Sequence, residues 1–137
     1  DNVDPVCVAA PQVAVKAFLQ GSYDDATGLM SDQLRVLGLI PTTSPYVGTG
    51  EKTTQEVFSV TGPNAIVDWI VLELRSAQDP TQVLKSRSAL LQRDGDIVDI
   101  DGVSPVSLIG VNASGYFLAV RHRNHLAMMT GSAVLLD

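Results

Sequence analysis

The most informative run of hydrophobic and polar positions along the chain is residues 66–75 (IVDWIVLELR). Successive side chains of a strand point to opposite faces. One face would then carry Ile66, Asp68, Ile70, Leu72 and Leu74. The other face would carry Val67, Trp69, Val71, Glu73 and Arg75. Because both faces are mainly apolar, the pattern predicts a central strand that is covered on both sides.

Shorter apolar or alternating runs predict seven further strands, at residues 13–19, 53–60, 83–92, 96–101, 106–109, 115–123 and 132–136. Residues 93–96 (RDGD) predict a tight hairpin turn. Residues 21–50 are rich in glycine and proline and predict one long loop, with at most a short helical turn near 31–37. About eight strands joined by turns predict an all-β protein, a two-sheet antiparallel β-sandwich of the immunoglobulin-like or jelly-roll-like kind.

The length of 137 residues is typical of a single domain. Pro5 and Pro11 interrupt the first residues, so we divide the chain into an N-terminal arm, 1–12, and one β-sandwich domain, 13–137.

Composition excludes several classes of partner. The net charge of −6 disfavours binding to the phosphate backbone of a nucleic acid. No uncharged apolar stretch reaches the ~20 residues that a membrane-spanning helix needs. Cys7 is the only cysteine, so no disulfide can form within one chain. We interpret it as a small apolar side chain, or as the site of a link between two chains.

Three sequence blocks, at residues 66–75, 86–102 and 120–126, resemble a module of secreted surface proteins of Bacteroidetes. Residues 16–21, 27–30 and 38–41 are similar to the opening of the same module. These proteins are described as haemagglutinin-like or adhesin-like and are exported by the type IX secretion pathway. The resemblance implies an extracellular or cell-surface location for a secreted bacterial protein and a β-sandwich fold. It implies no particular activity.

Charged side chains on or beside the predicted central strands are the first candidates for chemistry. Two carboxylates that flank a cleft could hydrolyse a glycosidic bond. Asp68 and Glu73 fall on opposite faces of their strand and therefore could not act on one substrate. We expect instead a set of structural ion pairs in which arginines hold the carboxylates. The residues expected to form it are Asp68, Glu73, Arg75, Arg87, Arg121 and Arg123.

An acidic hairpin raises the question of calcium. Its carboxylates are Asp94, Asp96, Asp99 and Asp101. The glycines do not fall where a calcium loop of the EF-hand type requires them, and Asp-Gly pairs also form turns without metal. We therefore predict no cofactor, with calcium as the weaker alternative. His122 and His125 are too few for a structural zinc site.

No pattern in the sequence predicts a catalytic nucleophile, and we predict that the protein is not an enzyme. We expect a homo-oligomer or polymer, a self-assembling structural or adhesive subunit of a surface fibre or layer. An extended arm carrying Val6, Cys7 and Val8 could add a strand to the sheet of a neighbouring copy, or pair with its own sheet. The alternative is a module that binds a carbohydrate or another ligand, with the loops at 21–50, 110–115 and 124–131 as the recognition surface.

Overall fold

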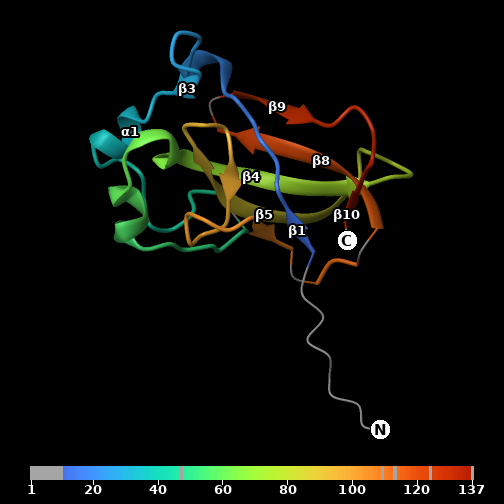
Figure 1. Cartoon of the computed structure of the whole chain (residues 1–137). Coiled ribbons are helices and arrows are strands. Elements are labelled where there is room, and N and C mark those ends of the chain that lie inside the picture. Colours follow the sequence, from blue (N-terminus) through green and yellow to red (C-terminus); the bar gives the residue numbers. More distant parts are fainter. Residues whose placement is uncertain (1–10, 47, 109, 113, 124, 137) are drawn as a thin grey trace, which may run out of the picture.

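A six-stranded antiparallel sheet forms the body of the molecule (Figure 1). The computed structural model describes residues 11–136 with the exception of 47, 109, 113 and 124. The strand order is β6-β5-β4-β8, and both β9 and β10 lie beside β8 on the far side from β4. Within the described residues, no helix is long and apolar enough to span a membrane.

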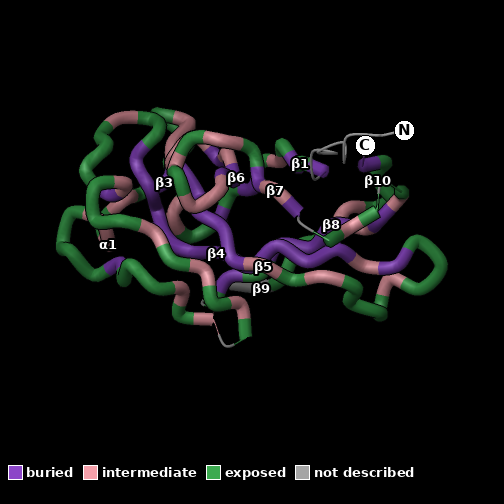
Figure 2. Tube along the Cα trace, turned by 90° about the horizontal axis from the view of Figure 1, so that it is seen from below, coloured by how far each residue is buried: buried purple, intermediate pink, exposed green. Residues whose placement is uncertain are grey.

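Strand β4 (Ile66–Ser76) occupies the centre, between β5 (Val83–Gln92) and β8 (Ser114–His122). Every residue of β4 except Arg75 is buried, as the purple central tube of Figure 2 shows. The predictions of a central strand at 66–75 and of a strand at 83–92 are therefore confirmed. The connection between them is a turn in which the Ser76 amide donates to Gln82 O at 3.0 Å.

The alternation predicted from the sequence assigns Ile66 and Val67, the first residues of β4, to the wrong faces of the strand. Ile66 packs with Trp69 in one apolar cluster, whereas Val67 packs with Ile70 in the other. The reason is an irregularity in the ladder between Ile66 and Asp68, where β4 shifts its register against β5. A bulge of this kind places an extra residue in one strand and reverses the alternation beyond it.

Both faces of the sheet carry apolar clusters, as expected for a strand that is apolar on both sides. The larger cluster is covered by residues 11–19 and by β7 (Val106–Ser107), which pairs with β1 (Gln12–Val13). The smaller cluster surrounds Trp69 and Leu90 and is covered by Ile40 and Phe58. The long excursion between residues 31 and 60 therefore closes one end of the second face.

Residues 13–19 keep the predicted alternation of burial, but they do not form a continuous strand. Val13, Ala17 and Leu19 are buried in the larger cluster. Only Gln12–Val13 pairs as a strand, with β7, and Lys16 then forms a single bridge with Asp96. The segment changes its neighbour from β7 to the β5–β6 hairpin, and this change interrupts the ladder.

The prediction of a strand at 53–60 is wrong. Residues Gln55–Ser59 form a 3-10 helix, η2, in which Phe58 is buried and Val57 packs partly against the same cluster. Adjacent side chains cannot face one core from a strand, whereas a helical turn allows it.

The expected long loop at 21–50 contains more regular structure than predicted. A small ribbon pairs β2 (Tyr23–Asp24) with β3 (Leu29–Met30), and the short helix α1 (Gln33–Val36) lies within the predicted helical turn. Two further short segments form the 3-10 helices η1 (Gln20–Ser22) and η3 (Gly62–Asn64) in the described part of the chain.

The hairpin at residues 93–96 forms as predicted, although its second strand, β6 (Ile97–Val98), is shorter than the expected 96–101. The Gly95 amide donates to Gln92 O at 2.9 Å, and Gly95 has a φ of 93°. The turn needs a residue with positive φ, which explains the glycine.

Residues 124–131, expected as a loop, instead contain β9 (His125–Met129). β9 pairs with Ala119, Val120 and His122 of β8, and β10 (Val134–Leu136) pairs with Ser114, Gly115 and Tyr116 of the same strand. β9 and β10 therefore form one edge of the sheet, interrupted at residues 130–133.

The described residues thus form an all-β structure, with one main antiparallel sheet and two two-stranded ribbons.

The close contact at Gly95 makes a stability prediction. A Cβ on this residue would lie 2.7 Å from the Phe18 ring, in a backbone conformation that L residues rarely adopt. We expect Gly95→Ala to lower the free energy of unfolding by roughly 2 kcal/mol, measured by urea denaturation. Gly131→Ala is the matched control, because a Cβ there meets nothing within 4 Å. Equal stability of the two variants would contradict this account of the turn.

Candidate functional site

Glu73 is the centre of the first group of charged side chains. Its Oε1 accepts from Arg75 Nη2 at 2.6 Å, and its Oε2 accepts from Arg121 Nη1 at 3.1 Å. Glu73 is buried, whereas the Arg121 side chain is 58% exposed. Two arginines therefore neutralise one buried carboxylate, and Arg75 also donates to Pro80 O in the β4–β5 turn.

Asp68 is the centre of the second group, at the other end of β4. Its Oδ2 lies 2.8 Å from His122 Nε2 and 3.1 Å from Arg123 Nη2. Its Oδ1 accepts from the Trp69 amide at 2.8 Å. Asp68 and Glu73 thus bind different partners, and neither is directed into a cleft with the other.

The loop at residues 44–49 is attached to the second face of the sheet by hydroxyl groups. Tyr46 donates its hydroxyl to Trp69 O at 3.2 Å and accepts from the Arg123 amide at 3.1 Å. Burial raises the pKa of the Tyr46 hydroxyl above its usual value. Ser88 Oγ lies 2.5 Å from Ser44 Oγ and donates to Thr49 Oγ1 at 2.8 Å. These contacts hold the loop against β5.

Arg87 joins β5 to the segment before β7. Its guanidinium donates to both carboxylate oxygens of Asp99, at 2.7 and 3.2 Å, and to Ser107 O at 2.6 Å. This fork-to-fork geometry is the one that arginine favours for a carboxylate.

The acidic hairpin uses its carboxylates for turns and ion pairs. Asp94 accepts from the Asp96 amide at 3.0 Å, and Asp96 pairs with Lys16 at 2.8 Å. Asp101 accepts from the amides of Val103 and Ser104, both at 2.9 Å. Among the residues that the structure describes, no three His, Cys, Asp or Glu side chains are grouped to hold a metal ion.

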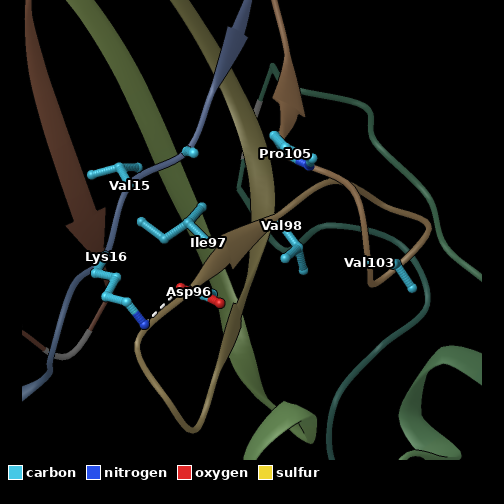
Figure 3. Close-up of a pocket in the computed structure, with 8 residues that line it drawn as sticks. Val15, Lys16, Asp96, Ile97, Val98, Val103 and Pro105 are labelled. Atoms are coloured by element: carbon cyan, nitrogen blue, oxygen red, sulfur yellow. Dashed lines mark ion pairs between the residues drawn. The ribbon is translucent and has the colours of Figure 1, made fainter.

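A small apolar pocket of about 250 Å³ lies beside the hairpin (Figure 3). Val15, Ile97, Val98 and Pro105 are among the residues that line it. The Lys16–Asp96 ion pair lies at its side, and the hydrogen bond from Lys16 to Asp96 raises the pKa of the lysine. Its volume is below the ~300 Å³ from which ligand pockets usually start. It has room for a small apolar group.

A larger and more polar groove of about 670 Å³ runs along the outer side of β5. Its floor is Lys85, Ser86 and Arg87. One wall is formed by residues 48–52 and the other by Asp99, Ile100 and Ser107. Sequence reasoning missed this groove. The sequence held no signal for it, because its lining comes from three separate segments of the chain.

The opposite edge of the sheet is apolar. Met128, Met129, Val134 and Leu135 are exposed on β9 and β10, Leu135 by 73%. Residues 126–136 contain no Asp, Glu, Lys or Arg. Within the described part of the chain, β9 and β10 pair with β8 alone, so their outer side is a free sheet edge.

Val6, Cys7 and Val8, which we expect to form the assembly arm, lie outside the described residues. Gln12, at the end of that arm, belongs to β1. The chain matches no known family model, no curated protein and no solved structure.

The buried Asp68 pair makes the second prediction. Asp68→Asn keeps the shape of the side chain and removes the charge that Arg123 and His122 contact. We expect the free energy of unfolding to fall by about 2 kcal/mol, less than for a fully buried pair because Arg123 is partly exposed. Urea denaturation measures it, with Asp25→Asn on the exposed surface as the control. A change no larger than that of the control would argue against a structural role for the pair.

Proposed function

We propose that this protein is a non-catalytic, extracellular structural or adhesive subunit that assembles with copies of itself into a surface fibre or layer. The observation that carries the proposal is the uncharged, apolar free edge at β9 and β10. An exposed apolar edge strand favours pairing with another chain, which is why monomeric proteins usually protect such edges with charge or proline.

The two edges of the main sheet differ, and the difference supports a head-to-tail arrangement. At the β5 edge, the Ser88 amide donates to Glu51 Oε1 at 2.5 Å, and Arg87 Nε donates to Ser88 O at 3.2 Å. Charged side chains thus occupy part of that edge, whereas the β9–β10 edge carries none. Contacts between unlike surfaces, when repeated without closure, produce a filament.

The same proposal covers location, mechanism and fold. The resemblance of residues 66–75, 86–102 and 120–126 to a secreted Bacteroidetes module supports a cell-surface location. The arm with Val6, Cys7 and Val8 would add a strand to a neighbouring copy. We propose a sandwich-like fold, which the β1–β7 ribbon over the larger apolar cluster supports. The ion pairs that occupy Asp68, Glu73 and Asp99 support a non-catalytic role.

The size of the protein in native solution tests this proposal. We expect particles far larger than a monomer in sedimentation velocity, and filaments or sheets in electron microscopy. Leu135→Lys, which places a charge on the free edge, should shift the distribution towards monomer. Val36→Lys is the control, because Val36 is 65% exposed on α1, away from the sheet edges. A wild-type protein that stays monomeric at high concentration would overturn the proposal.

A carbohydrate-binding module is the second candidate, and the polar groove beside β5 favours it. Aromatic platforms for a sugar ring are few, since Trp69 is completely buried. The exposed aromatic pair is Phe18 and Tyr23, whose rings meet edge to face at 5.1 Å. A glycan array should show binding that Lys85→Ala, in the groove, weakens and Lys16→Ala, outside it, keeps. An array without hits would dispose of this candidate.

A further inference from the structure

The outer edge of β5 offers main-chain groups to the groove. In an antiparallel strand the N–H and C=O of one residue point to the same side, and residues two apart share that side. The Ser88 amide reaches Glu51, which lies outside the sheet, so the main-chain groups of Ser86 point outwards too. β6 pairs with Leu90 and Leu91 of β5, and in the described part of the chain no strand lies beside Ser86. At Ser88 this edge is occupied, because Glu51 accepts from its amide and Arg87 donates to its carbonyl. The open part of the edge is therefore at Ser86, on the floor of the groove.

The walls of the groove are held in place on both sides. Residues 44–49 are attached to Ser88 and Trp69 through the hydroxyls of Ser44, Thr49 and Tyr46. The opposite wall is joined to the floor by the Arg87–Asp99 pair. A strand that adds to a sheet lies about 4.8 Å from its neighbour. A groove of about 670 Å³ along the edge gives such a strand room between fixed walls.

The charge of the groove indicates an acidic occupant. Lys52 and Lys85 line it, and neither forms an ion pair with any residue that the structure describes. The third lysine, Lys16, is paired with Asp96. The groove is lined by Lys52, Lys85 and Arg87 against Glu51 and Asp99, and Asp99 is paired with Arg87. In a chain with a net charge of −6, this local excess of positive charge favours an acidic ligand.

We propose that this groove accepts residues 1–10 of a second copy of the chain as an added strand. That segment, DNVDPVCVAA, contains two acidic and no basic side chains, and its Val6, Cys7 and Val8 have the apolar character of an edge strand. The proposal rests on the proposed self-assembly and names the acceptor site for it. Asp1 and Asp4 would lie near Lys52 and Lys85, and main-chain hydrogen bonds to Ser86 would set the register.

The direction of β1 favours a second copy over the same chain. Leu108 donates its amide to Pro11 O, one residue beyond the pairing of Gln12 with Ser107. Ser107 lines the groove, so β1 lies beside this wall, and at Pro11 the chain leads on past Leu108, beyond the last residue of the wall. In Figures 1 and 2, β1 and β10 lie at the same end of the molecule, so the start of the described chain is on the side of the free apolar edge.

The β9–β10 edge is the less suitable acceptor for this segment. It carries no lysine to bind the acidic side chains, and its interruption at residues 130–133 leaves only two short paired stretches. β5, in contrast, pairs with β4 without interruption along Lys85, Ser86, Arg87 and Ser88.

The test is the binding of a labelled synthetic peptide of residues 1–10, with Cys7→Ser to prevent disulfides, to the full-length protein. Fluorescence anisotropy should report saturable binding that weakens as salt rises. Ser86→Pro removes an outward N–H without touching the β4 ladder and should abolish binding, whereas Ser86→Ala keeps the N–H and should bind as wild type. Lys52→Glu with Lys85→Glu should weaken binding about tenfold at low salt. Lys16→Glu is the charge control and should have little effect.

Two results overturn the proposal: an excess of the peptide that neither binds to the wild type nor reduces the size of its particles in sedimentation velocity, or equal binding by Ser86→Pro and Ser86→Ala. Urea denaturation of each variant shows whether the substitution has destabilised the fold. If Ser86→Pro has done so, the peptide binding of the protein with Lys52→Glu and Lys85→Glu decides the outcome instead. Sedimentation of the same samples separates this inference from the proposed function. Large particles that persist in Ser86→Pro would reject the groove and leave self-assembly in place, whereas a monomeric wild type would reject self-assembly itself.

Discussion

The antiparallel pairing of β4 with both β5 and β8 is the interaction on which the rest of the structure depends. Because β4 is apolar on both faces, the sheet must be covered on both sides to keep that surface from water. The two covers come from different parts of the chain. Residues 11–19 and β7 close one face, and residues 31–60 close part of the other. Most of the excursions between strands therefore serve to bury one central strand.

Buried charge organises the polar part of the molecule. Glu73, Asp68 and Asp99 each lie at a point where two or more segments meet, and each is held by at least one arginine. Desolvation offsets much of the attraction in such pairs, whereas removal of one partner leaves the other charge buried and unpaired. Arg87 and Asp99 also fix one wall of the groove, so the same pair positions a surface that the proposed assembly uses.

The strands that sequence reasoning places well are long ones, at residues 83–92 and 115–123. Both pair along much of their length with the long central strand β4, so a short local irregularity does not hide them. The errors come from local events that periodicity does not record. A bulge exchanges the faces of Ile66 and Val67, and a helical turn lets Val57 and Phe58 face one core. The groove was missed because it brings together residues 48–52, 85–87 and 99–107, which only the folded sheet places side by side.

The interruption between β9 and β10 has a consequence for the state of the protein at high concentration. β9 and β10 pair with β8 in different registers, because the segment between them, residues 130–133, contains more chain than a continuous strand would need. A flat, unbroken edge of this composition would be a template for cross-β stacking. A foreign strand can follow the register of β9 or that of β10, but not both at once. The edge can therefore remain apolar enough for a specific contact while the growth of an amyloid-like ladder along it is stopped after a few residues.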